Sequence, residues 1–373
     1  MAPDVPTPTD GDLLPTPFGL VGREADLLAV LDRLADPTLP WLTLTAGPGL
    51  GTSTLASEAL RLHVARTDDR VVRLDARNAQ DAGALVQAID AVRPPWPDPD
   101  RTTFVWLDDL PPGLLTPHDA EALTTGPGPV RIVATGAAPV GHGRERVWSP
   151  GPLAVPDLDV RDPERMTDAP ATELFLASAR RHGWTGIPAD LDAATRTSVA
   201  LATRLLQGHP LSLVLAGYAW ARGDLGDPVA PLPDLARRLE VNAPDLPPHQ
   251  RSLLAHGRAA GAAAPPDLAP FLRRLAFVGV PASVATLAHA DARDEALVRR
   301  DLSRLEALGL VTRSGGAGHP PTYRVPAGLR AALRADAHET ADADADAAFV
   351  ARYRDDVFAR LTRVADALQG PGE

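Results

Sequence analysis

A glycine-rich turn between a strand and a helix constrains this chain more than any other stretch. Residues 41–56 read WLTLTAGPGLGTSTLA: an apolar run of strand character enters a Gly/Pro turn, and a helical pattern starts at Ser53. In that layout, backbone N–H groups of the turn and of the first helical turn point into one concavity, where the helix dipole also favours an anion. The sequence therefore predicts a phosphate-binding loop. The alternative is a glycine-rich turn that binds nothing.

The loop departs from the full signature G-x-x-x-x-G-K-[ST] at two positions. When the signature is set on Gly51, Ala46 stands at the first glycine and Thr52 at the lysine, while Ser53 keeps the hydroxyl that would ligate Mg²⁺. All 37 basic residues are arginine, so no lysine can reach the loop from elsewhere. The predicted phosphate cradle consists of Gly49, Leu50, Gly51, Thr52, Ser53 and Thr54.

Composition narrows the class of protein. With 373 residues, 45% hydrophobic and 23% charged, the chain is expected to form two or three globular domains. It has no cysteine, which excludes disulfides and thiolate metal sites. No signal peptide and no membrane span are visible, so we expect a cytoplasmic protein without a membrane partner. A net charge of −11 argues against a general polyanion binder.

A second apolar strand, Thr103–Asp109, ends in two carboxylates. A buried parallel strand delivers its last side chains to the carboxyl edge of the sheet, where ligands bind in open α/β folds. Asp108 is therefore a candidate ligand of Mg²⁺, together with Ser53, and Asp109 a candidate for orienting an attacking water. The alternative is that Asp109 caps the turn that follows.

The rest of the chain falls into blocks of different pattern. Strand and helix signals alternate up to about residue 155, and a helix is expected over 82–92. Helical patterns split by Gly/Pro turns follow, the last of them roughly over 232–240. Three helices with two short strands come after Pro248, and the third helix, over 294–308, is expected to turn Leu297, Leu302, Leu305 and Leu308 inward. The last block has the pattern of a winged helix. The expected organisation is a disordered N-terminus (1–15), an α/β P-loop parallel-sheet domain (16–155), an all-α lid (156–247), a winged-helix domain (248–335) and an acidic segment with an amphipathic helix (336–373).

Seven pieces in this order resemble the bacterial STAND-class signal-transduction ATPases related to NB-ARC proteins. The similar stretches are the FGLVGRE motif (18–24), the Walker A strand and loop (42–56), Walker B (103–109), the sensor strand RIVATGAAP (131–139), QGHPL (207–211), the run into the winged helix (248–253 and 271–277) and YRV (323–325). The resemblance covers about residues 16–335. It implies an AAA+/STAND-like fold that closes over ATP or ADP, with Val21, Gly22 and Arg23 against the adenine and Pro210 packed on the nucleotide.

The departures from the family pattern decide the expected mechanism. Thr52 replaces the Walker A lysine and Ala137 the sensor arginine, so two cations that would neutralise transition-state charge are missing. Phosphoryl transfer is catalysed almost wholly by positioning and such electrostatics. We therefore expect a regulatory switch that binds ATP or ADP, with Mg²⁺, weakly or not at all, that hydrolyses little or nothing, and that acts through a regulatory or effector protein.

Two other functions stay open on the sequence. Arg299, Arg300 and Arg304 fall on the expected recognition helix, and Arg313 and Arg324 on the expected wing, which is the pattern of a winged-helix DNA-binding regulator. An active ATPase that uses an unconventional cation is the other. A tail stripe at helical spacing is expected either to pack on the winged helix or to bind the partner, and consists of Val350, Val357, Leu361, Val364 and Leu368.

Overall fold

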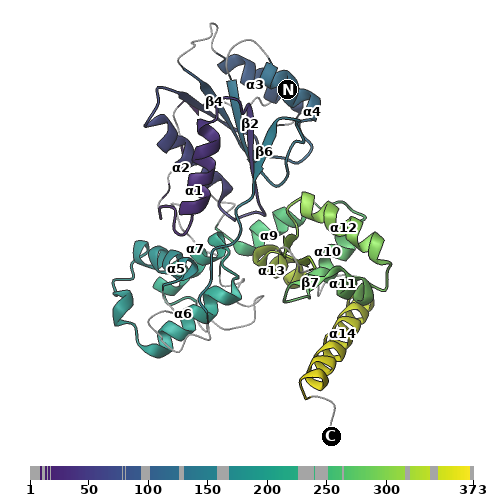
Figure 1. Cartoon of the computed structure of the whole chain (residues 1–373). Helices are drawn as coiled ribbons and strands as arrows, with labels where there is room; N and C mark the ends of the chain where they lie inside the picture. The colour runs from purple at the N-terminus through teal and green to yellow at the C-terminus, as the bar shows by residue number, and fades with distance from the viewer. Residues whose placement is uncertain are drawn as a thin grey trace. The chain divides into compact units, whose positions relative to one another are not determined.

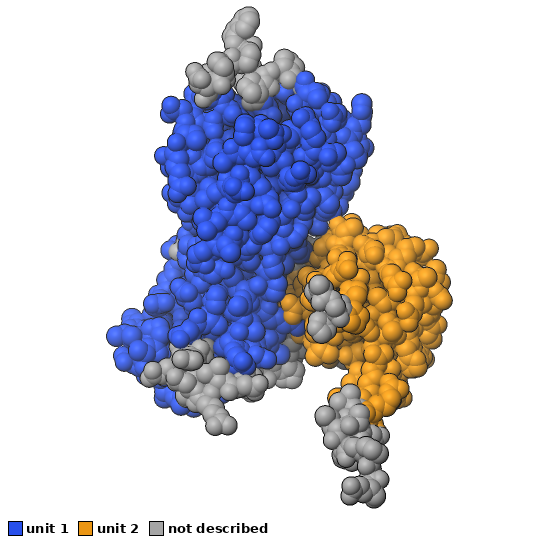
Figure 2. Space-filling model, in the orientation of Figure 1, with its two compact units in different colours: residues 1–229 blue, residues 230–373 orange. Residues whose placement is uncertain are grey.

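The computed structural model of the chain contains two compact units, residues 1–229 and 230–373 (Figure 2). It describes residues 9–10, 13–14, 16, 18–77, 79, 81–93, 101–125, 130–157, 168–225, 239, 251–262, 264–315, 320–336 and 343–369, without the side chains of 9–10, 256, 259 and 364–369. The helix expected over 232–240 lies outside these residues except for Leu239, so it stays a prediction.

A six-stranded sheet organises the described part of the first unit. Its order is β1-β3-β4-β5-β2-β6, and every neighbouring pair is parallel except β1 with β3. This sheet of five parallel strands with flanking helices fits the predicted α/β P-loop fold. The strands are β1 (Thr9–Asp10), β2 (Trp41–Thr45), β3 (Arg70–Asp75), β4 (Thr103–Leu110), β5 (Val130–Gly136) and β6 (Glu145–Trp148).

Helices cover both faces of the sheet (Figure 1). Phe104 and Trp106 of β4 belong to a core cluster with α1 and α2, whereas Val105 and Leu107 belong to a cluster with α3 and α4. Alternate residues of the strand are thus buried on opposite faces, which explains its unbroken apolar run. The helices are α1 (Glu24–Ala35), α2 (Thr52–Val64), α3 (Ala82–Val92) and α4 (Pro117–Thr125).

Helices alone follow the sheet in the described residues 168–225. Three of the four elements begin with Pro at the first helical position, where its fixed φ favours a helix start. The helices over 170–181 and 210–221 pack closely, since a Cβ at Gly217 would lie 2.2 Å from the backbone oxygen of Phe175. The elements are α5 (Pro170–Arg181), the 3₁₀ helix η2 (Pro188–Asp190), α6 (Ala193–Leu205) and α7 (Pro210–Ala221).

The second unit combines helices with a small antiparallel sheet of order β7-β9-β8. Its elements are α9 (Leu253–Ala262), α10 (Ala269–Leu275), β7 (Ala282–Ser283), α11 (Val284–Asp291), α12 (Glu295–Ala307), β8 (Thr312–Ser314), β9 (Thr322–Arg324), α13 (Ala327–Asp336) and α14 (Ala343–Gln369).

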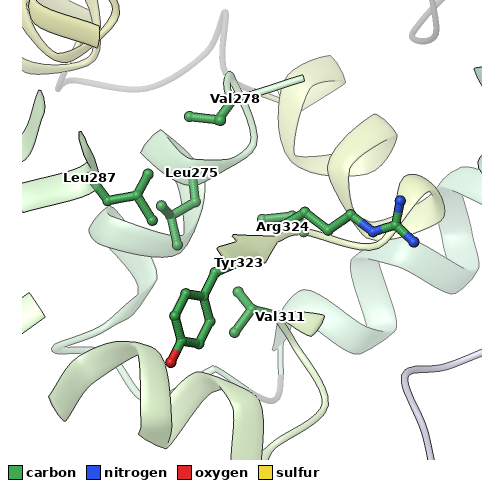
Figure 3. Close-up of a pocket in the computed structure, with 7 residues that line it drawn as sticks. Leu275, Val278, Leu287, Val311, Tyr323 and Arg324 are labelled. Carbon is green, nitrogen blue, oxygen red and sulfur yellow. The ribbon is translucent and has the colours of Figure 1, made fainter. Parts of the chain in front are cut away.

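One apolar core fills this unit. Figure 3 shows Leu275, Leu287, Val311 and Tyr323 grouped around a small pocket, while the side chain of Arg324 extends away from them. Leu302 and Leu305 of α12 are fully buried as their spacing predicts, but Leu297 is exposed, so its predicted inward position is wrong.

Residues near both ends of the chain make tertiary contacts. Thr9–Asp10, within the N-terminus expected to be disordered, pair with the open edge of β3, and the Leu14 carbonyl accepts a hydrogen bond from Ser57 Oγ at 2.9 Å. At the other end, the sequence predicts a solvated helix start or a linker over the acidic repeat 341–348. From Ala343 the repeat is the start of α14, but Asp346 is buried in an ion pair with Arg273 at 2.9 Å rather than solvated.

Candidate functional site

The predicted phosphate loop leaves the carboxyl end of β2 and enters α2, as the sequence indicates. Gly49 and Gly51 have φ angles of 80° and 87°, a left-handed conformation in which glycine is favoured, and Gly51 is the N-cap of α2. The N–H groups of the next three residues belong to the first helical turn and have no partner within the helix. The hydroxyls of Thr52, Ser53 and Thr54 are also without a hydrogen-bond partner among the described residues.

Three consecutive loop carbonyls are held by neighbouring segments of the first unit. The Pro48 oxygen lies 2.8 Å from Nε2 of His209, the Gly49 oxygen accepts the Leu211 N–H at 3.2 Å, and the Leu50 oxygen accepts Nη2 of Arg23 at 3.1 Å. The carbonyls are therefore fixed by the protein itself.

His209 is the contact of α7 with the loop. It is the N-cap of α7, and its Nδ1 accepts the N–H of Ser212, so its Nε2 carries the proton that is donated to the Pro48 oxygen. The ring also fills the space over Gly49, where a Cβ would lie 2.6 Å from Cε1. The neighbouring Pro210 is half-exposed at the first position of α7. Its predicted packing on a nucleotide stays a prediction.

The predicted adenine segment packs against the start of α5. Gly22 has a φ of 63°, and a Cβ there would lie 2.4 Å from Cβ of Pro170, so only glycine fits. Arg23 is buried and also donates to Asp26 at 3.0 Å, which leaves it committed to the loop and to α1. Val21 is half-buried beside them. The roles predicted for these residues toward adenine stay predictions.

The two carboxylates of β4 lie at the same edge of the sheet as the loop, in a β-bulge. The pairing of β4 with β5 shifts between Leu107 and Leu110, and Asp109 has a left-handed φ of 61°. The Thr135 side chain replaces the missing ladder contacts: its hydroxyl accepts the Asp109 N–H at 3.1 Å and donates to Oδ1 of Asp108 at 2.9 Å. The bulge thus aims the two carboxylates in different directions.

Each carboxylate has its own arginine. Oδ2 of the buried Asp108 accepts Nε of Arg73 at 3.1 Å and Nη2 at 2.6 Å. Asp109 is half-exposed and pairs with Nε of Arg77 at 2.8 Å. The roles predicted for Asp108 as a ligand of Mg²⁺ and for Asp109 in orienting a water stay predictions.

The sequence analysis missed both arginines and the contact made by His209. A signal for Arg73 exists, because it is the charged residue between the buried Val72 and Leu74 of β3. A charge inside a buried strand requires a partner, and the register of β3 with β4 brings Asp108 near. His209 offered no comparable signal, since its partner is 161 residues away.

The sensor strand places its arginine at the far end of β5. Arg131 donates to the carbonyls of Arg33 and Leu34 at the end of α1 and to that of Leu39, with distances of 3.1, 2.7 and 2.9 Å. Burial lowers the pKa of its guanidinium, and nearby Asp36 and Asp69 act against that effect. Arg131 thus caps α1 and does not replace the arginine missing at Ala137.

Two kinds of feature are absent from the described residues. They contain no helix with the length and apolar character needed to cross a bilayer. They also contain no group of three or more His, Asp or Glu side chains arranged to hold a metal ion.

No family model matches the sequence, and no curated protein matches it. Solved structures with similar backbones include the ORC1 protein of Aeropyrum pernix in complex with DNA, at 15% identity and TM-score 0.36 over 86% of this chain and 93% of that one. Drosophila ORC bound to DNA is similar at 12% identity and a TM-score of 0.36, over 87% of this chain and 89% of that one. A STAND protein with a tetratricopeptide repeat sensor from Pyrococcus horikoshii is similar at 11% identity and a TM-score of 0.30, over 87% of this chain and 43% of that one.

Proposed function

We propose that this protein is a regulatory switch of the STAND/NB-ARC type, which binds ATP or ADP weakly or not at all and acts through a protein partner. The observation that carries the proposal is the set of bonds from Arg23, His209 and Leu211 to three successive loop carbonyls. The bonds from His209 and Leu211 hold α7, a helix of the predicted lid, on the loop. Opening of that contact is then the switching step, a hinge motion of an ordinary kind.

Missing positive charge supports a role other than turnover. Thr52 stands at the lysine position, Ala137 at the sensor arginine, and Arg131 is committed to the end of α1. The loss of one such transition-state contact slows catalysis by about 10²-fold or more. We therefore expect no steady release of phosphate from ATP. Sustained release that Asp108→Ala abolishes would instead establish the alternative of an active ATPase with an unconventional cation.

Calorimetry with ATP and with ADP tests the binding part of the proposal. The wild-type chain is compared with Thr52→Lys, which restores the charge at the one position where the signature requires it. If the cradle is intact and lacks only charge, Thr52→Lys binds at least tenfold more tightly. Ala65→Lys, at the exposed C-cap of α2, adds the same charge away from the loop; it is the matched control and should not gain affinity. Equal affinity in all three proteins would argue that the loop does not receive phosphates.

The exposed end of α14 supports a partner. Phe358 and Leu361 are 61% and 59% exposed, whereas Phe349 and Tyr353 nearer the start of the helix pack on the core of the second unit. Packing on the winged helix, one of the two roles predicted for the tail stripe, is therefore wrong for Leu361. Binding of a partner is the other role, and we propose it here. The side chains of Val364 and Leu368 lie outside the described ones. A pull-down in which Phe358→Ser/Leu361→Ser loses a partner captured by the wild type tests this role.

A DNA-binding regulator is the second candidate, and the exposure of Arg299 and Arg300 on α12 favours it, at 62% and 63% of their side chains. Other features weigh against it. Arg304 is paired with Asp267 at 2.7 Å, and burial lowers the pKa of Arg324 on β9. A salt-dependent gel shift that Arg299→Ala/Arg300→Ala abolishes would support this candidate, and no shift at low salt would exclude it.

A further inference from the structure

The carboxylate of Asp108 has both oxygens engaged. Oδ2 receives two N–H groups of the Arg73 guanidinium, at 3.1 and 2.6 Å, and Oδ1 receives the Thr135 hydroxyl at 2.9 Å. The side chain of Asp108 is 3% exposed, so water has little access to it. The acid that the sequence singled out as a metal ligand is thus enclosed by protein donors.

The fold itself positions Arg73 for this pairing. β3 and β4 are parallel neighbours in which Arg73 pairs with Trp106 and Asp75 with Asp108, so the guanidinium has to reach two residue pairs along the sheet. It lies over the Trp106 ring, 5.3 Å from the ring centroid, and its side chain is 17% exposed. Two strands and an aromatic face therefore hold the cation in place.

A divalent cation does not fit this arrangement. Mg²⁺ takes oxygen ligands at about 2.0–2.1 Å in near-octahedral geometry, and its usual protein ligands are carboxylates. Here a positive charge already lies beside the carboxylate, because Nη2 of Arg73 is 2.6 Å from Oδ2 of Asp108. A metal at Oδ1 would share that oxygen with the Thr135 hydroxyl and would lie close to a like charge, in a place where water screens poorly. The hydroxyl of Ser53 alone is a weak ligand.

We propose that Arg73 takes the place of the divalent metal in this chain, so that Asp108 is a partner of an internal cation and not a ligand of Mg²⁺. In consequence, an anion that binds at the start of α2 does so without a metal. The first statement concerns Asp108 alone. The second rests on the proposed function, because it requires that the loop receive a nucleotide.

The statement that Asp108 is not a metal ligand is tested by titrating the full chain with Mn²⁺ alone and measuring the bound metal by electron paramagnetic resonance. Wild type and Asp108→Asn should bind Mn²⁺ equally and weakly. Arg73→Gln removes the charge, and we expect it to gain one site at least tenfold tighter than any in the wild type. Arg77→Gln is the matched control: it removes the arginine of the neighbouring exposed pair with Asp109 and should gain no such site.

Two results would overturn the proposal. One is a Mn²⁺ site in the wild type that disappears in Asp108→Asn, since this would make Asp108 a metal ligand with Arg73 in place. The other is a folded Arg73→Gln chain that gains no site, since the arginine would then not be what excludes the metal. If Arg73→Gln does not fold, the comparison of wild type with Asp108→Asn still decides the first question.

Calorimetry with ADP, in Mg²⁺ and then in EDTA, tests the second statement. In the wild type we expect the dissociation constants of ADP in Mg²⁺ and in EDTA to agree within twofold. In Arg73→Gln we expect Mg²⁺ to tighten ADP binding tenfold or more. A tenfold Mg²⁺ effect in the wild type contradicts the inference while leaving nucleotide binding intact. A complete lack of ADP binding counts against the loop as a nucleotide site and leaves the Mn²⁺ comparison to decide the role of Arg73.

Discussion

Gly49 and Gly51 share a backbone conformation but not surroundings, which makes them a natural pair of probes. Both have left-handed φ angles, of 80° and 87°. A Cβ at Gly49 would lie 2.6 Å from the His209 ring and 3.0 Å from Leu211, whereas a Cβ at Gly51 would meet nothing within 4 Å. Any difference between alanine substitutions at the two positions therefore reports the contact of the loop with α7.

We expect Gly51→Ala to lower the free energy of unfolding by about 1 kcal/mol, the penalty for a left-handed alanine. Gly49→Ala should lose about 1–3 kcal/mol more, because the added methyl group forces His209 away from the loop. Urea unfolding followed by circular dichroism measures both. Equal losses in the two variants would mean that α7 does not rest on the loop.

Asp69 should make stability depend on pH in the acid range. Burial acts to raise the pKa of Asp69, but hydrogen bonds from the Thr102 N–H and from His63 and Thr67 outweigh it and hold the pKa below the ordinary 3.8. The two nearest contacts are each 2.8 Å. A carboxyl whose pKa is lowered by folding stabilises the protein above its unfolded pKa, and this contribution disappears as the pH falls through the folded pKa.

Comparison with Asp69→Asn isolates that contribution. At pH 7 the wild type should be more stable by about 1–3 kcal/mol, the usual contribution of hydrogen bonds to a charged group. As the pH falls below 3.8 and through the lowered pKa of Asp69 in the folded protein, the difference should shrink toward zero. Urea unfolding at pH 7 and at a series of acid pH values provides the measurement, and a difference that stays constant across the series would contradict the assignment.

The sequence predicted where the loop and Asp108 lie in the fold better than it predicted their contacts. The spacing around Gly51 indicates the loop, and the end of the apolar strand indicates Asp108, because both follow from local pattern. The partners of these groups come from other strands and helices. Arg73 reaches Asp108 through the register of β3 with β4, and His209 reaches Pro48 only through tertiary folding. For Arg73 the sequence shows only a charge inside a buried strand and not its partner, and for the contact of His209 it carries no signal.

At the scale of elements, α14 changes character along its length. Phe349 is fully buried in the core of the second unit and Asp346 is paired with Arg273, while Phe358, nine residues later, is 61% exposed. The first turns are thus part of the folded unit, and the later ones are held mainly by helix propensity. Helices without tertiary contacts are marginal in water at that length.

Two phenylalanines on this one helix test the division. Phe349→Ala should lower the free energy of unfolding by about 3–5 kcal/mol, as expected for a buried aromatic side chain. Phe358→Ala should change it by less than about 0.5 kcal/mol, because little is buried. Thermal unfolding of the full chain measures both. A large loss in Phe358→Ala would show that the exposed end packs on something within the same chain.

Strands and helices were predictable where one physical cause dominates. The expected helix over 82–92 agrees with α3 in its bounds, because Asp81 caps it and its apolar residues are regularly spaced. β1 and β6 were not predicted. Each is short and lies at an edge of the sheet, where stability comes from pairing with β3 or β2 and not from local pattern.

At the scale of the whole molecule, each unit has its own apolar core. The clusters around Trp41 and Leu44 belong to residues 1–229, and the cluster around Phe271 belongs to residues 230–373. We therefore expect residues 230–373, produced alone, to give a helical circular dichroism spectrum and a cooperative thermal transition. A chain of this length without such a transition would show that the second unit depends on the first.

The bond between His209 and Pro48 joins residues 161 positions apart. During synthesis at about 5–20 residues per second, the ribosome needs roughly 8–30 s to go from one to the other. For most of that time β2 and α2 have been synthesised, yet the Pro48 oxygen lacks the His209 imidazole that it contacts in the folded chain. The glycine turn consequently reaches its final shape only late in translation, after the strands on either side of β2 have been made.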